Sequence, residues 1–122
     1  MSPATRLMEI AHARSGDKGN HANIAVFAYT VAGYAWLRAH LTADAVQQFF
    51  APLHPLRVVC YEAPNVRALN FILYDVLAGG ASTSLRSDTQ GKTLGLALLQ
   101  MPVDLTDEQA ESMRRPKARR LP

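Results

Sequence analysis

The sequence predicts an α+β domain, built as a two-layer sandwich of about four strands with helices covering one face of the sheet. Two observations support this prediction. Short apolar runs with strand character alternate along the chain with segments whose apolar residues recur at helical spacing. The chain has 122 residues, which is the length of one domain, and 48% of them are hydrophobic, as expected for a chain with its own core.

The first two strands are expected on either side of a polar loop. Residues 6–13 are predicted to form one strand and residues 24–29 a second, which is apolar on both faces and is therefore expected at the centre of the sheet. Residues 15–23 between them are rich in Gly, Asn, Asp and Ser, a composition typical of loops. We therefore expect a hairpin with an enlarged loop.

Two helices are expected next, over residues 31–40 and 43–50, because both segments show helical spacing of their apolar residues. Thr42 is expected to cap the second of these helices, and Pro52 and Pro55 to end it.

The second half of the chain is predicted to begin with a strand over residues 56–62. Asn65 would then cap a helix over residues 66–78, ended by Gly79 and Gly80. The apolar stripe that predicts this helix is formed by Leu69, Ile72, Leu73, Val76 and Leu77.

The last elements are less sharply defined by the pattern. Residues 81–86 are expected as a short polar strand or extended loop. Asp88 is expected to cap a final helix that reaches about residue 101, and alternation of leucines over residues 94–98 leaves a strand as the alternative. We expect one domain over residues 1–103 and a polar, basic, poorly ordered tail over residues 104–122.

The net charge of +3 arises from the end of the chain. The last nine residues hold five cations and no acid, and the rest of the chain has eight cations against ten acids. No aromatic residues alternate with the terminal cations to stack on bases, so a solvated terminus is favoured over a nucleic-acid arm. Nucleic acid is therefore not an expected partner.

Several sequence patterns that mark secreted, membrane or metal-binding proteins are absent from the chain. The N-terminus has no signal-peptide pattern, and no apolar run approaches the roughly 18 residues of a membrane span. We therefore expect a cytoplasmic protein with no membrane partner. Cys60 stands alone in an apolar run and is expected as a small strand residue rather than a catalytic thiol. The four histidines show no metal-ligand spacing, so neither a metal nor a cofactor is expected.

The first of three polar clusters that could hold chemistry lies at residues 14–23. Two glycines let backbone N–H groups converge, as an anion-binding nest requires, but a tight turn explains the same residues equally well. His21 is the one histidine that we would test as an acid or base. The candidate ligand-binding residues of this cluster are Arg14, Ser15, Gly16, Lys18, Gly19, Asn20 and Asn23, and Asp17 is a candidate catalytic base.

The second cluster follows a predicted strand and offers Glu62 as a catalytic base and Asn65 as a ligand-binding residue. The third cluster, residues 79–92, places glycines and hydroxyls beside Arg86 and Lys92, which are the residue types of a phosphate or carboxylate site and also of an ordinary turn. Ser82 and Ser84 have no local His–acid relay, so a hydrolase triad is poorly supported.

The three clusters in this order resemble the C-terminal domain of the AtuA family, proteins associated with acyclic terpene utilisation. The resemblance covers about residues 7–103 and rests on three motifs: Ser15-Gly16-Asp17-Lys18-Gly19-Asn20, Glu62-x-Pro64-Asn65, and Ser84-Leu85-Arg86 with Gly91-Lys92. It implies a ferredoxin-like fold. Longer members of the family carry a large N-terminal domain before this region, so the resemblance implies a stand-alone small subunit that docks on an AtuA-type large one. The family's third glycine and Thr-Arg pair near Gly79 are partly replaced here, which puts one cationic contact in doubt.

Three functions remain open at this point, and whether the chain is an enzyme is open with them. The first is an accessory subunit of a terpene or acyl-CoA catabolic enzyme. The second is an independent lyase or hydratase acting on a CoA ester or small carboxylate, with Asp17 or Glu62 as base and with Lys18, Arg86 and loop N–H groups stabilising an enolate-like oxyanion. The third is a non-catalytic homo-oligomeric module. We expect a homo-oligomer in every case, because a two-layer sandwich leaves one sheet face to cover.

Overall fold

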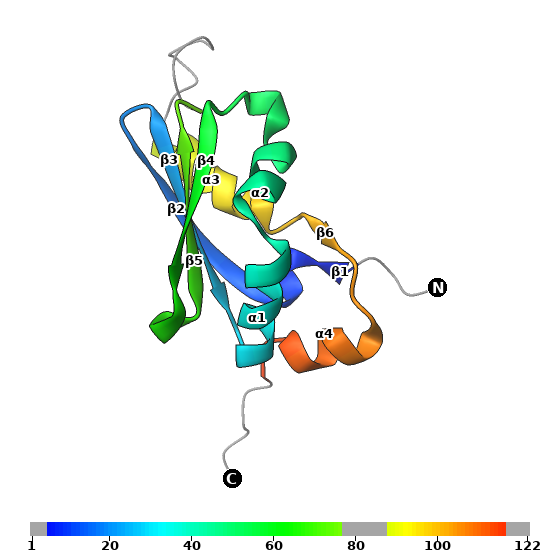
Figure 1. The fold of residues 1–122 in the computed structure, drawn as a ribbon. Helices are drawn as coiled ribbons and strands as arrows, with labels where there is room; N and C mark the ends of the chain where they lie inside the picture. Colours follow the sequence, from blue (N-terminus) through cyan, green and yellow to red (C-terminus); the bar gives the residue numbers. More distant parts are fainter. Residues whose placement is uncertain (1–4, 77–87, 117–122) are drawn as a thin grey trace.

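The computed structural model of the chain describes residues 5–76 and 88–116, without the side chains of Lys18 and of residues 88–92. It forms an α+β fold in which a four-stranded sheet packs against a layer of helices (Figure 1). The predicted strand or loop at residues 81–86 lies outside the described residues.

The sheet is antiparallel throughout, with strand order β2-β3-β5-β4. Its strands are β2 (Ala11–Lys18), β3 (His21–Ala28), β4 (Arg57–Ala63) and β5 (Ala68–Tyr74). The second predicted strand is thus a central one, as expected, and the strand expected at residues 56–62 is β4. Directly paired residues share a face of the sheet.

The connection between β2 and β3 is shorter than the sequence predicts. The two strands pair without interruption from Ala11 with Ala28 to Lys18 with His21, so only Gly19 and Asn20 form the turn. Gly19 has a φ of +60°, a conformation that glycine adopts without steric cost. The enlarged loop expected over residues 15–23 is therefore wrong. Outside the Gly19–Asn20 turn, the polar residues of this segment are strand residues.

The two helices after the hairpin are confirmed as α1 (Val31–His40) and α2 (Ala43–Phe49). The side chain of Thr42 accepts a hydrogen bond from the backbone N–H of Ala45, as expected of an N-cap, and Thr30 caps α1 in the same way. Both helices lie to the right of the sheet in Figure 1, with α2 above α1.

The helix predicted over residues 66–78 is wrong, because Ala68–Tyr74 form strand β5. Leu69 and Leu73 are four residues apart, which fits a helical stripe and a strand face equally well. Phe71 decides between the two: it is fully buried with these leucines, whereas Ile72 is only half-buried. A short 3-10 turn, η3 (Pro64–Val66), joins β4 to β5, so Asn65 lies in a turn rather than at a helix cap.

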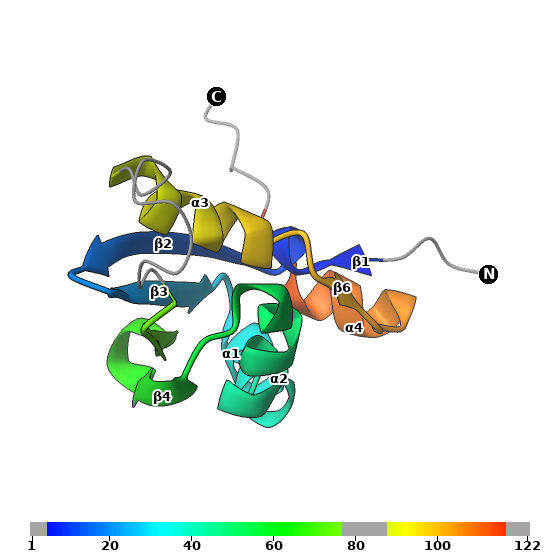
Figure 2. The same cartoon turned by 90° about the horizontal axis from the view of Figure 1, so that it is seen from above.

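The final predicted helix is confirmed as α3 (Asp88–Leu98), and Figure 2 shows it lying along β2. The helices cover one face of the four-stranded sheet, because their buried residues join the inward residues of the strands in one core. This core includes Leu37 of α1, Val46 of α2, Leu94 and Leu98 of α3, Ile24 and Val26 of β3, and Leu69, Phe71 and Leu73 of β5.

The order of elements explains the ferredoxin-like character of the fold. From β3 onward the chain runs strand, helices, strand, strand, helix, and β5 lies between β3 and β4. This is the split βαβ arrangement of ferredoxin-like folds. The fourth strand, β2, comes from the front of the chain and pairs with the outer side of β3.

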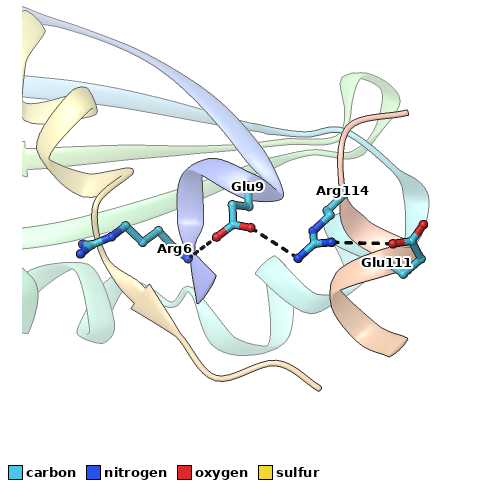
Figure 3. A network of polar contacts seen from close by, with 4 residues as sticks. All are labelled: Arg6, Glu9, Glu111 and Arg114. Atoms are coloured by element: carbon cyan, nitrogen blue, oxygen red, sulfur yellow. Dashed lines mark hydrogen bonds and ion pairs between the residues drawn. The ribbon is translucent and has the colours of Figure 1, made fainter. Parts of the chain in front are cut away.

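The first part of the segment beyond residue 103 differs from the poorly ordered tail that the sequence predicts. A two-stranded sheet pairs β1 (Thr5–Arg6) with β6 (Pro102–Val103), and helix α4 (Asp107–Met113) follows, with a capping box at its start and two buried residues. Arg114 makes ion pairs with Glu9, at 3.5 Å, and with Glu111, at 3.7 Å (Figure 3). The tail expected to be poorly ordered from residue 104 therefore begins with a packed helix.

Candidate functional site

The two faces of the four-stranded sheet differ in their cover. The face that carries Ile24 and Phe71 is buried under the helices. No helix of the described chain covers the opposite face, which we call the open face. By register, the open face is formed by His12, Arg14, Gly16 and Lys18 of β2, His21, Asn23, Ala25 and Phe27 of β3, Arg57, Val59, Tyr61 and Ala63 of β4, and Ala68, Asn70, Ile72 and Tyr74 of β5.

The open face has apolar, aromatic and neutral polar residues on its central strands and cations on its edge strands. Phe27 and Ile72 are only half-buried although they lie on the two central strands, and Tyr61 is 54% exposed. None of the open-face positions holds an acid, whereas Arg14 and Arg57 on the two edge strands are exposed. This surface therefore presents large side chains to solvent within a positive field.

A recess interrupts the open face near the Gly19–Asn20 turn. It has a volume of about 310 Å³ and is lined by Gly16, Asn23, Asn70 and Ile72, with Asp17 beside them. Asn23 donates a side-chain hydrogen bond to the Oδ1 of Asn70, which is its diagonal neighbour across the β3–β5 pair. The two amides thus form one polar wall of the recess.

Next to this recess, His21 is held by the end of β5. The backbone N–H of Asp75 donates to His21 Nδ1 at 3.0 Å, and the His21 ring packs edge-on against Tyr74. Because Nδ1 accepts this bond, the proton of the neutral ring lies on Nε2. The guanidinium of Arg57 lies 4.5 Å from the centre of the Tyr74 ring on its other side. His21 is thus part of a packed aromatic and cationic cluster, and its Nδ1 is not free to act as a base in this arrangement.

Three of the candidate residues from the first polar cluster, Arg14, Gly16 and Asn23, lie on the open face, and the register puts Lys18 at the next open-face position. Gly19 and Asn20 form the turn at the end of the hairpin. The structure therefore gathers much of this cluster on one surface.

Ser15 points to the opposite face and contacts α3. Its Oγ accepts a hydrogen bond from the backbone N–H of Gly95 at 2.8 Å. A Cβ at position 95 would lie 2.7 Å from this oxygen and 3.1 Å from the Ser15 Cβ, so Gly95 is what allows α3 to approach β2. The structure thus gives Ser15 a packing role between helix and sheet.

The two candidate bases do not meet. Asp17 and Glu62 lie on opposite edge strands, with β3 and β5 between them. Three strand spacings of about 4.8 Å separate these edges by about 14 Å. Asp17 is also level with Val58 in the register, four residues from Glu62 along β4. Glu62 forms an ion pair with Arg38 of α1 at 3.3 Å.

The remaining candidates are placed as follows. Asn65 lies in the η3 turn, at the end of the sheet opposite the Gly19–Asn20 turn. Lys92 lies in α3, where its side chain is not described, and Arg86 lies outside the described residues. Asn70, which the sequence suggested only as a buried hydrogen-bonding residue, joins the recess. The alternation of Leu69, Asn70 and Phe71 could have placed it there if the segment had been interpreted as a strand.

Cys60, the single cysteine of the chain, lies on β4 two residues before Glu62. Burial, and after it the charge of Glu62, raises the pKa of Cys60 above its ordinary value. The thiol is therefore protonated at neutral pH, which is not the state of an activated nucleophile. Cys60 is half-buried and belongs to the strand, as the sequence predicted.

In the part of the chain that the structure describes, no group of three or more His, Cys, Asp or Glu side chains could hold a metal ion. No helix in the described ranges has both the length and the apolar character needed to cross a bilayer.

The fold and this face together define an α+β domain of ferredoxin-like type with one sheet face that no described helix covers. A model of the AtuA ferredoxin-like domain family matches residues 5–104, and the chain therefore belongs to this family. No curated protein and no solved structure shows a significant match.

Proposed function

We propose that this domain is a non-catalytic accessory unit that binds a partner protein through its open face. The partner that family membership favours is the AtuA-type large protein, within a terpene or acyl-CoA catabolic enzyme. The observation that supports the proposal most is the open face itself, where apolar and aromatic residues on the central strands remain only partly buried. Large apolar side chains gathered on one surface are typical of protein interaction sites.

The charges of the open face define the partner surface further. Arg14 and Arg57 flank the apolar centre, and the open-face strand positions include no acid. A partner with acidic residues around an apolar patch is complementary to this pattern. A second copy bound face to face would bring cations together, because a two-fold interface places the same patch on both sides. A homo-oligomer, if formed, is therefore expected to use another surface.

The positions of the candidate catalytic residues support an accessory role over an independent enzyme. Asp17 and Glu62 are on opposite edges of the sheet, Nδ1 of His21 accepts a backbone bond, and burial holds the Cys60 thiol in its protonated form. The described residues thus hold no assembled acid–base pair for lyase or hydratase chemistry. Binding of a CoA thioester or another small anion is, in this proposal, a property of the complex.

The experiment measures complex formation between the purified chain and a purified AtuA-type large protein. We expect a stable complex in size-exclusion chromatography with light scattering, weakened by Arg14→Glu and by Tyr61→Ala. Leu96→Ala is the control, because Leu96 is 64% exposed on α3, in the helix layer.

Three results would count against the proposal. The first is no complex at micromolar concentrations, and the second is a complex that is equally sensitive to Leu96→Ala. The third is tight binding of a fluorescent oligouridine to the open face, because exposed aromatics on a cationic sheet can also stack on bases.

A further inference from the structure

Gly16 lies in the middle of strand β2, where neither the backbone conformation nor a close neighbour requires a glycine. It has no positive φ, and no described atom lies within 4 Å of the place that a Cβ would occupy. Glycine weakens a strand interior, since it adds conformational freedom and no side chain to pack. Where neither a bend nor a crowded neighbour requires it, glycine in a strand marks a place where a ligand or another backbone approaches closely.

The wall of the recess next to Gly16 offers unused hydrogen-bonding capacity. One bond joins the side-chain amides of Asn23 and Asn70. An amide has two N–H donors and an oxygen with two lone pairs, so this bond leaves donors and acceptors on the pair. If both amide groups are turned over, so that nitrogen and oxygen exchange places, the pair still has both free donors and free acceptors. The pair therefore suits a group that both donates and accepts.

The lining of the recess suits a neutral group. Ile72 gives it an apolar side, and the Asn23–Asn70 pair gives it an uncharged polar side. Asp17 lines the recess next to Gly16 in the chain, but by register its side chain belongs to the opposite face of the sheet, with that of Ser15. A neutral amide meets the Asn pair with matched donors and acceptors. The volume of about 310 Å³ leaves room for a group of that size with its neighbouring carbon atoms.

We infer that the recess around Gly16 receives an amide group of the protein that covers the open face, either a main-chain amide or an Asn or Gln side chain. This inference rests on the proposed function and names the contact that anchors it. The recess is continuous with the open face, because Gly16, Asn23 and Ile72 share one row of the sheet register. A partner lying on the half-exposed residues of β3 and β5 therefore passes directly over it.

The test uses graded filling of the recess. Gly16→Ala and Gly16→Val add side-chain atoms into space that the fold leaves open, so both variants are expected to fold as the parent does. Affinity for the AtuA-type large protein is measured by isothermal titration calorimetry. We expect Gly16→Val to weaken binding by at least about tenfold, as loss of an interface anchor does, and Gly16→Ala to fall between it and the parent.

Two further variants separate the recess from the rest of the face. Asn70→Leu keeps the approximate volume but removes the amide, and we expect it to weaken binding by about tenfold. Ala63→Val makes a similar apolar addition on the open face but at the far end of β4, and we expect a change of less than about threefold. Circular dichroism and thermal melts confirm that each variant is folded.

The possible failures are distinguishable. Binding that Gly16→Val leaves unchanged, or that Ala63→Val weakens as strongly, overturns the recess contact and leaves the proposed function standing. Absence of any complex with the parent chain overturns both. If the parent chain alone forms a dimer that Gly16→Val dissociates, the recess binds a second copy, and the choice of partner is wrong.

Discussion

Replacing Gly95 with alanine adds a methyl group at the closest contact between α3 and β2. The new Cβ would lie 2.7 Å from Ser15 Oγ and 3.1 Å from Ser15 Cβ. Rotation of the Ser15 hydroxyl relieves the first contact but breaks its hydrogen bond with the Gly95 N–H. The second contact cannot be relieved by rotation, so the helix has to move away from the strand.

The expected loss of stability combines three contributions, of which two are unfavourable and one is favourable. Overpacking at such a contact costs about 1–3 kcal/mol, and losing the hydrogen bond adds about 1 kcal/mol. Replacing glycine by alanine inside a helix returns about 1 kcal/mol. We therefore expect Gly95→Ala to lower the free energy of unfolding by about 2 kcal/mol, and Tm by roughly 6–10 °C.

Chemical denaturation with urea, followed by circular dichroism, measures this loss. Gly16→Ala is the matched control, because its added Cβ meets no neighbour within 4 Å, and we expect its stability to equal or slightly exceed that of the parent. Ser15→Gly combined with Gly95→Ala removes the crowded atoms and should recover part of the loss. If Gly95→Ala is as stable as the parent or more stable, helix propensity outweighs packing, and Ser15 does not have the structural role described above.

Three more predictions concern β5, the thiol and the C-terminal helix. Phe71→Ala should cost about 3–5 kcal/mol because Phe71 is fully buried, whereas Ile72→Ala should cost far less; equal losses in urea titrations would contradict the strand register. The raised pKa of Cys60 means that the folded state holds its proton more tightly, so stability should fall as pH rises above the ordinary thiol value, and a Cys60→Ala variant that retained the same alkaline fall would refute that cause. Arg114→Ala should cost no more than about 1 kcal/mol, because its ion pairs with Glu9 and Glu111 are exposed; a larger loss in thermal melts would show that this network holds α4 in place.

The helix–strand error at β5 shows where the sequence pattern is ambiguous. Leu69 and Leu73 satisfy both periods, and Ile72 extended the apparent helical stripe. The aromatic and β-branched residues Phe71, Ile72 and Tyr74 favour a strand by propensity, but pairing with β3 and β4 is what decides it. The pairing with β3 joins residues more than forty positions apart, and no local pattern contains it.

The hairpin and α4 were mispredicted because of their polarity. The loop-like composition of residues 15–23 predicts a loop, yet all of these residues except Gly19 and Asn20 belong to a ladder with polar side chains on its accessible sides. Thr106 and Gln109 form a capping box whose signal is visible in the sequence, and the buried Ala110 and Met113 are three residues apart on one helix face. Both signals indicate a packed helix beyond residue 103, where the polar composition instead predicts a poorly ordered tail.

The candidate site was predictable only in part. The importance of the segment from Arg14 to Asn23 is visible in the sequence, but the alternation that sends Ser15 to α3 and Gly16 to the open face depends on its being a strand. The contact between Asn23 and Asn70 depends on the order of strands in the sheet. Neither follows from spacing along the chain.

The open face as the partner-binding surface is tested most directly by NMR titration of the ¹⁵N-labelled chain with an AtuA-type large protein. We predict that the largest changes in amide shift or intensity fall on the central strands β3 and β5, near Ala25 and Ile72, and extend to Tyr61 on β4. Amides of α1 and α2 should change little. Changes confined to the helix layer, or no change at saturating partner, would contradict the account.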